Sequence, residues 1–253
     1  YPLDSITHIV VGAVAGDVFF KKKLGKKALL WGGFAQSVPD FDFLAGFWLP
    51  THEELLVHRG LTHSLFFAIL MAPLLAWAAR SIHHKQSPDI KQWTLFFLMQ
   101  MGIHIFLDGF NNYGTGYLEP FSSQRFSLNA IYVVDPLVTI FPFIAAIVLF
   151  RKNINDPNRK RWWKIGIILP VVYLTFACLI KWKIDADTRK ILKQQNISFT
   201  QYFTTPAPLS NWLWFVVAGN DSGYHVGYRS IFDKKDSIRF NYFPRNEQLL
   251  SRV

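Results

Sequence analysis

Six segments of the chain are rich in apolar residues, and short polar stretches separate them. The segments cover residues 6–20, 28–49, 65–79, 93–110, 133–150 and 162–182. They are long enough, or nearly so, to cross a bilayer core of about 30 Å as helices. The second segment contains Pro39-Asp40-Phe41-Asp42, where a helix is expected to break. The pattern predicts an all-α polytopic membrane bundle of about six spans.

The chain from residue 183 onward has a different pattern of polar and apolar positions. Residues 183–196 are typical of a polar, partly amphipathic helix, and short apolar runs follow. The runs expected to form strands are 212–218, 224–232 and 238–243. Asn220-Asp221-Ser222-Gly223 fits a hairpin turn between the first two runs. We therefore expect a transmembrane helical domain over residues 1–182 and a small β-rich C-terminal extramembrane domain over residues 183–253.

The composition supports a membrane protein. Apolar residues make up 51% of the chain and charged residues only 17%, compared with about 25% charged in a typical soluble domain. The single cysteine, Cys178, lies inside an apolar run, which excludes a disulfide framework.

The net charge of +10 fits the same class, because the basic residues gather in particular loops. Loops 20–27, 80–91 and 151–161 are alternate loops, so six spans place them on one side of the membrane. The positive-inside rule makes that side cytoplasmic. We therefore expect a multi-pass protein of the bacterial inner membrane with an extracytoplasmic C-terminal tail, and no nucleic-acid partner.

This orientation gathers the chemically interesting polar residues near the outer face of the membrane. They are His8, Asp40, Asp42, His58, His63, His104, Asp108 and Asp135. The orientation was derived from Lys and Arg alone, so the gathering is an independent observation. Ionisable groups near a membrane interior are costly unless they are paired or bind a ligand. The sequence therefore predicts an extracytoplasmic site.

Six of these residues are candidate metal ligands. His104 and Asp108 are four residues apart on a helical pattern and share one face, although a buried His–Asp hydrogen bond is the alternative. Asp40 and Asp42 lie in the helix break, where a solvated turn is the alternative, and the sequence does not separate them as ligands. His8 and His63 complete the predicted set. Histidine and aspartate without cysteine favour one or two Zn²⁺ ions, with Mn²⁺ or Fe²⁺ as alternatives.

Three further residues are candidates for the catalytic machinery. His58 is a candidate ligand, a residue supporting a ligand, or an acid–base group. Arg59 matches the geometry of an anionic phosphate, and an interfacial anchor is its alternative role. Asp135 precedes Pro136 and is either a helix N-cap or a carboxylate that holds a ligand histidine.

The order of these motifs resembles the YdjM-like family of membrane-bound metal-dependent hydrolases. The motifs that match are Asp4-Ser5-Ile6-Thr7-His8, Pro39-Asp40-Phe41-Asp42, His58-Arg59-Gly60-Leu61-Thr62-His63-Ser64, His104-Ile105-Phe106-Leu107-Asp108, Asn112-Tyr113-Gly114-Thr115, Pro120-Phe121-Ser122, Arg125-Phe126 and Asp135-Pro136. The resemblance covers about residues 4–150. The family is distantly similar to zinc-dependent phospholipases C and single-strand-specific zinc nucleases.

The resemblance implies that His63, His104, Asp108 and Asp40 or Asp42 form one zinc site. His8 would then be a ligand of a second site that shares Asp108. Those soluble enzymes also use a free N-terminal residue as a ligand, whereas residues precede His8 here, and a later His/His/Glu trio for a third ion is not found. Some family members are described as binding a LexA-type repressor, which implies a repressor-type protein partner at a cytoplasmic surface.

We therefore expect a metal-dependent hydrolase with phospholipase C-like chemistry. Its substrate would be a phosphoester, or another ester, of a lipid or lipid-linked molecule, cleaved by metal-activated water at the outer membrane interface. A membrane-anchored binding or regulatory protein with a structural metal is the first alternative. A metal transporter is the second, although three of the spans have almost no polar residues in their middles.

Overall fold

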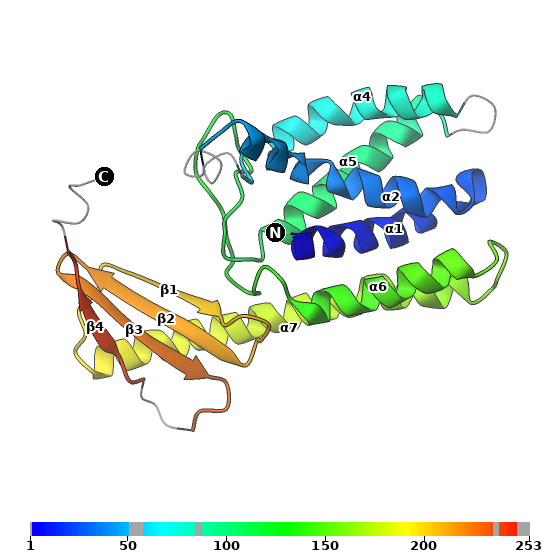
Figure 1. Cartoon of the computed structure of the whole chain (residues 1–253). Helices are drawn as coiled ribbons and strands as arrows, with labels where there is room; N and C mark the ends of the chain where they lie inside the picture. The colour runs from blue at the N-terminus through cyan, green and yellow to red at the C-terminus, as the bar shows by residue number, and fades with distance from the viewer. Residues whose placement is uncertain (1, 51–57, 84–87, 235–237, 247–253) are drawn as a thin grey trace. The chain divides into compact units, whose positions relative to one another are not determined.

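The computed structural model describes residues 2–50, 58–83, 88–234 and 238–246 (Figure 1). They form two compact units. One consists of Tyr1–Leu128 with Pro136–Tyr173, and the other of Asn129–Asp135 with Leu174–Val253. The fold class is confirmed in its coarser form, because the chain is mostly helical and has a small C-terminal antiparallel sheet.

Each of the six apolar segments contains a helix. The helices are α1 (Pro2–Leu24), α2 (Lys27–Ser37), α4 (Leu65–Ile82), α5 (Ile90–Asp108), α6 (Pro136–Arg151) and α7 (Arg159–Gln194). Within the described residues, α4 and α7 are long and apolar enough to cross a membrane, judged by length and composition, and α6 is a shorter apolar helix. The number of membrane crossings stays a prediction.

The predicted helix break at Pro39 is confirmed. Helix α2 ends at Ser37, and a 3₁₀ helix, η1 (Pro39–Phe47), follows it. A second short 3₁₀ helix, η2 (Leu61–His63), precedes α4. Val38, the residue before the proline, keeps α-helical dihedral angles. Proline has no N–H to continue the α-helical hydrogen bonding, so the chain changes from α-helical to 3₁₀ geometry at this point.

Helices α1 and α2 are antiparallel and pack closely through glycines. A Cβ atom on Gly32 would lie 1.9 Å from the carbonyl oxygen of Gly12, and one on Gly16 would lie 2.2 Å from the oxygen of Ala28. Only glycine permits this approach of two backbones, a contact that is common between helices in membranes. The contact fixes α1, and therefore His8, against its neighbour.

Helices α4 and α5 form the other half of the helical core. Helix α4 buries a row of alanines, and this row contains Ala68, Ala72, Ala76 and Ala79. The row packs with larger side chains of α5, among them Trp93, Phe97 and Met101. This pairing holds α5, which carries His104 and Asp108.

The helix ends of the first unit gather at two opposite ends (Figure 1). One end holds the end of α1, the start of α2, the end of α4, the start of α5 and the end of α6. Basic residues lie in the last turns of α1, α4 and α6, among them Lys23, Arg80 and Arg151. The opposite end holds η1, η2 and the end of α5, where the predicted site residues lie.

The second unit contains the four-stranded antiparallel sheet. Its strands, in spatial order, are β1 (Gln201–Pro206), β2 (Leu213–Asn220), β3 (Gly223–Ser230) and β4 (Asn241–Pro244). The predicted hairpin turn is confirmed, because β2 and β3 pair up to Asn220 and Gly223. The three predicted strand runs correspond to β2, β3 and β4, and β1 was not predicted.

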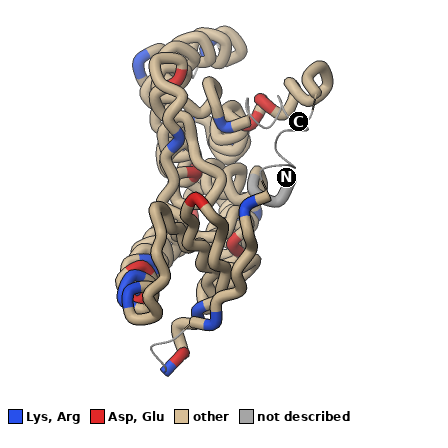
Figure 2. The backbone as a smooth tube through the Cα atoms, turned by 90° about the vertical axis from the view of Figure 1, so that its left-hand side faces the viewer, with Lys and Arg blue, Asp and Glu red and all other residues tan. Residues whose placement is uncertain are grey.

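One face of the sheet packs against the C-terminal half of α7. Trp214 of β2 contacts Ile184, and Val216 contacts Ile191. The end of this half of α7 carries both basic and acidic residues, whereas residues of other types make up most of the chain (Figure 2). The domain boundary expected at residue 183 lies inside α7, and that division stays a prediction.

Candidate metal centre

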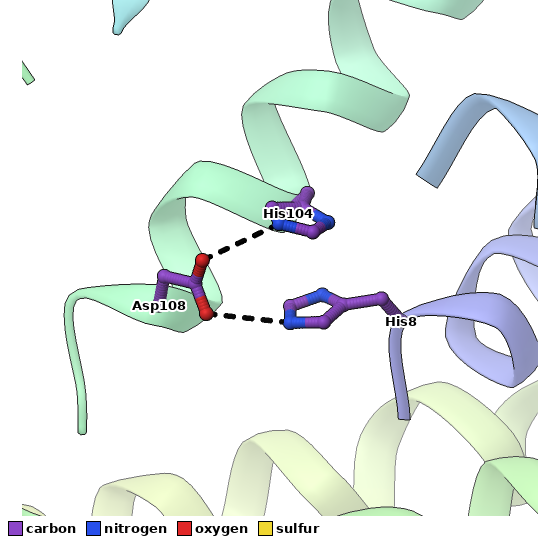
Figure 3. Close-up of side chains that lie close together, drawn as sticks. All are labelled: His8, His104 and Asp108. Carbon is purple, nitrogen blue, oxygen red and sulfur yellow. Dashed lines mark ion pairs between the residues drawn. The ribbon is translucent and has the colours of Figure 1, made fainter. Parts of the chain in front are cut away.

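His104 and Asp108 share one face of the last turn of α5, as their spacing predicted. Asp108 extends one carboxylate oxygen toward His104 and the other toward His8 of α1 (Figure 3). Asp108 Oδ2 lies 3.3 Å from His104 Nε2, and Oδ1 lies 3.3 Å from His8 Nε2. The His8 and His104 rings stack with their centroids 3.7 Å apart. All three side chains are buried.

His63 and Asp40 come to the same point from two other segments. His63 Nε2, at the end of η2, lies 3.2 Å from both Asp108 Oδ2 and His104 Nε2. Asp40 Oδ1, in η1, lies 3.5 Å from His63 Nε2 and 3.4 Å from His104 Nε2. Five predicted residues therefore converge from four segments of the chain.

The spacing of these atoms matches a tetrahedral zinc site. With Zn–N and Zn–O distances of about 2.0–2.1 Å, neighbouring ligand atoms lie about 3.3–3.4 Å apart. The triad of His63, His104 and Asp108 has the size of one tetrahedral face, with sides of 3.2–3.3 Å. Replacing Asp108 by Asp40 gives a second such triad, with sides of 3.2–3.5 Å.

The donor atoms are also prepared for a cation. Asp108 Oδ2 is buried and accepts no hydrogen bond from the described residues, although histidine nitrogens surround it. His104 Nδ1 lies 2.5 Å from the carbonyl oxygen of Gln36, which can only accept, so Nδ1 carries the proton. His104 Nε2 then directs its lone pair toward the centre. The donor set fits Zn²⁺, Mn²⁺ or Fe²⁺.

Asp40 and Asp42 occupy different positions. Asp40 faces the ligand atoms, and its Oδ2 accepts a hydrogen bond of 2.9 Å from Ser5 Oγ. Asp42 Oδ2 lies 3.5 Å from His63 Nδ1, on the side of the ring away from the centre. The same oxygen lies 3.3 Å from His58 Nδ1. The ligand role of Asp42 stays a prediction, and its geometry is that of a carboxylate which orients a ligand histidine.

Arg59 is buried beside Asp108 and has an unusual backbone conformation. Its Nη2 lies 3.4 Å from Asp108 Oδ1, and its guanidinium lies 5.4 Å from the centroid of the Tyr113 ring. Its φ angle is 58°, which is uncommon for a residue other than glycine. A hydrogen bond of 2.8 Å from its N–H to Asp42 Oδ2 holds this conformation. The loop therefore directs a guanidinium to the cluster.

The remaining predicted residues are His58 and Asp135. His58 is partly exposed, and its carbonyl oxygen accepts a hydrogen bond of 2.8 Å from Arg125 Nη1. Asp135 is buried in the second unit, directly before α6, and its supporting role stays a prediction. The sequence reasoning missed Gln36, since it contributes a backbone carbonyl, which leaves no signal in the sequence. It also missed Ser5 and Thr62, whose hydroxyl lies 3.1 Å from His63 Nδ1, although both belong to motifs that it identified.

The pKa of His63 is raised in the metal-free protein. Burial lowers this pKa, but the carboxylates of Asp108 and Asp40 raise it by more. The raised pKa favours the protonated imidazole of His63 when no cation is bound. A cation that takes Nε2 has to displace that proton.

Comparison with known proteins identifies the family. A family model described as YdjM inner membrane protein matches residues 3–184. The uncharacterized protein YfhP of Bacillus subtilis (strain 168) is 34% identical over 93 residues, which is 37% of this chain and 28% of YfhP. Inner membrane protein YbcI of Escherichia coli (strain K12) is 30% identical over 123 residues, which is 48% of this chain and 69% of YbcI.

No solved structure matches the chain. The stretch matched to YfhP spans less than a third of that protein. The family match is far longer and includes every residue of the cluster. Because it covers well over half of the sequence, the chain belongs to the YdjM inner membrane protein family.

Proposed function

We propose that the protein is a membrane-bound metal-dependent hydrolase that cleaves a phosphoester, or another ester, of a lipid or lipid-linked substrate. The observation that supports this most is that His63 and His104 form a triangle of tetrahedral size with Asp108 and a second one with Asp40. A bundle that needed only packing would not bury two imidazoles and a carboxylate together.

The same residues support this chemistry. One or two bound Zn²⁺ ions would supply water activation and polarisation of the substrate's oxygen. His63, His104 and Asp40 would hold one ion. His8 and Oδ1 of Asp108 would hold a second. Asp42 orients His63 through its Nδ1. His58 is less buried and touches Asp42, so it is positioned to exchange protons with solvent.

Arg59 supports a phosphoester over a carboxylic ester. Its guanidinium lies within 3.4 Å of Asp108, where a substrate bound at the cluster would meet it. A planar guanidinium matches two phosphate oxygens at once. Arg59 would bind the anionic group and orient the ester, without taking part in bond breaking.

The location proposed for the site is the outer interface of the inner membrane. The family is named for the inner membrane. The basic helix ends lie opposite the cluster in the first unit, and the positive-inside rule assigns such ends to the cytoplasm. In a six-span arrangement the cluster would then lie at headgroup depth, where it meets lipids readily.

A binding or regulatory protein with a structural metal is the second candidate. If one ion takes Asp40, His63, His104 and Asp108 together, its four positions are filled, as in structural zinc sites. X-ray absorption of the zinc-loaded protein separates the two. A water or open position supports the hydrolase, and four protein ligands around a single ion support the structural role.

The decisive experiment begins with metal content. Elemental mass spectrometry of detergent-purified protein should find one or two equivalents of zinc or manganese. The His104→Ala/Asp108→Ala variant should lose them, and His225→Ala, a histidine in β3, should keep them. The loaded protein should then hydrolyse phospholipid or phosphodiester substrates. Loaded protein that is inactive on all of these would refute the hydrolase proposal.

A further inference from the structure

Two apolar grooves flank helix α2 in the first unit. The larger, of about 670 Å³, lies among α1, α2 and α6, where Ala13, Leu29 and Ala146 line it. The smaller, of about 400 Å³, lies on the other side of α2, where Trp31 and His83 line it. Both volumes fall within the range of small-molecule sites. They are therefore large enough for ligands and not only packing defects.

A single row of side chains separates the grooves. Leu30 and Phe34 line both of them, and their exposed fractions are 64% and 40%. The two residues are four apart on α2, so they project from one face as a narrow ridge. Two parallel apolar grooves with a ridge between them match the two acyl chains of one diacyl lipid.

Both grooves have a basic residue at the same end of the unit. Arg151, the last residue of α6, lines the larger groove, and Lys27, the first residue of α2, lines the smaller. Lys26 Nζ lies 5.6 Å from the centroid of the Phe150 ring, which also lines the larger groove. In the described part of the chain, no acidic residue lines either groove. An anionic headgroup would complement this end.

This basic end is distinct from the candidate metal centre. The larger groove runs along α2 from Leu29 to Ser37, a rise of about 12 Å. Its other end reaches Ile9, the residue after His8. A lipid whose headgroup lies against the basic residues therefore keeps that headgroup away from the cluster.

We propose that α2 binds one anionic diacyl phospholipid, with an acyl chain in each groove and the headgroup phosphate against Lys26, Lys27 and Arg151. The site is separate from the proposed hydrolytic centre, and its occupant is not a substrate in a reactive position. Basic pockets between membrane helices bind anionic headgroups in this way.

Native mass spectrometry of the full detergent-purified chain tests the proposal. The probes are phosphatidylglycerol and phosphatidylcholine with identical acyl chains. The wild type should retain one phosphatidylglycerol molecule in preference to phosphatidylcholine. Removal of two charges by Lys27→Gln/Arg151→Gln should weaken its retention about 30-fold. The control Lys160→Gln/Arg161→Gln removes two charges from the start of α7, outside both grooves, and should retain the lipid.

The grooves are tested separately from the charges. Ala146→Phe fills part of the larger groove and should reduce phosphatidylglycerol retention, whereas Ile144→Phe, on the exposed side of α6, should not. Metal content should stay at the wild-type value in every variant, so this result is independent of the hydrolase test. Equal retention of both lipids, retention by the charge variant, or a second copy of the chain in place of lipid would overturn the proposal.

Discussion

At the scale of single residues, three of the clustered side chains have a second interaction that orients them. The Gln36 carbonyl holds His104, and Ser5 holds Asp40. Asp42 lies behind His63 and also accepts the N–H of Arg59. Residues behind a metal ligand commonly change metal affinity 10–100-fold when mutated. Mutation of a ligand residue and mutation of a residue that supports it should therefore reduce metal affinity by different factors.

Asp40 and Asp42 allow that difference to be measured. Asp40→Asn should abolish most zinc affinity, because Asp40 Oδ1 faces both His63 and His104. Asp42→Asn should reduce affinity by about 10–100-fold, because Asp42 supports His63 from the side of the ring away from the ligand atoms. Zinc titration against a competing chelator measures both values. A larger loss for Asp42→Asn than for Asp40→Asn would reverse the assignment.

Zinc binding should release a proton from His63. The pKa of His63 is raised when no cation is bound, which favours the protonated imidazole, and Nε2 has to lose its proton before it binds the ion. Affinity should therefore fall as pH falls, since protons compete with zinc for Nε2. Calorimetry in buffers with different heats of ionisation counts the protons released.

The matched variant for this measurement is His63→Ala. It should release fewer protons than the wild type on binding zinc. Heats that do not depend on the buffer, in both proteins, would show that His63 is neutral before the metal arrives.

At the scale of elements, the α1–α2 contact determines whether His8 reaches the cluster. The glycines allow the two backbones to approach at Gly12 and Gly32. At the other end of α1, buried Asp17 pairs with Arg159 and accepts a hydrogen bond of 2.7 Å from Trp163 Nε1. Helix α1 is therefore held at both ends, by a polar pair at one and by the candidate metal centre at the other.

A side chain at position 32 should separate these helices. In Gly32→Ala the added Cβ would meet the Gly12 carbonyl oxygen, which cannot rotate away. Overpacking of this kind costs about 1–3 kcal/mol or more. The control is Gly102→Ala in α5, where a Cβ would meet nothing within 4 Å. That control should be neutral or stabilised by up to about 1 kcal/mol, since alanine favours a helix.

Thermal unfolding in detergent, followed by circular dichroism, compares the two glycine variants. The melting temperature should fall in Gly32→Ala and stay level or rise in Gly102→Ala. Zinc affinity should fall as well in Gly32→Ala, because His8 is displaced. An unchanged melting temperature in Gly32→Ala would show that the helices do not pack as closely as described.

At the scale of the whole molecule, the sequence predicted the elements better than their details. Long apolar runs specify helices, Pro39 specifies the break, and Asn220 to Gly223 specify a turn, because each rests on local chemistry. Strand β1 was missed, since residues 201–206 have little apolar alternation and become a strand through pairing with β2.

The candidate site was predictable for a different reason. The charge of the loops alone placed its residues near one end, and the structure brings His8, Asp40, His63, His104 and Asp108 together there. The roles of Asp40 and Asp42 depend on how a 3₁₀ turn directs two side chains. That geometry arises from contacts with η2, which lie far away in the sequence.

The predicted membrane arrangement has a direct test in intact cells. In a background with Cys178→Ala, we expect Ser222→Cys, in the β2–β3 turn, to react with a membrane-impermeant thiol reagent. Asn155→Cys, between α6 and α7, should react only after the inner membrane is permeabilised, because the basic loops are predicted to be cytoplasmic. The opposite labelling pattern would place the cluster on the cytoplasmic side.

The cluster also has a consequence for the order in which the chain is made. Its first member, His8, is synthesised a hundred residues before its last member, Asp108. A complete set of donors exists only after α1, η1, η2 and α5 have all taken their places. Ion binding would therefore be a late step of biogenesis, because it requires all four segments to be correctly assembled. When the chain is synthesised without zinc, its N-terminal helix should be more accessible to proteases, even though synthesis is complete.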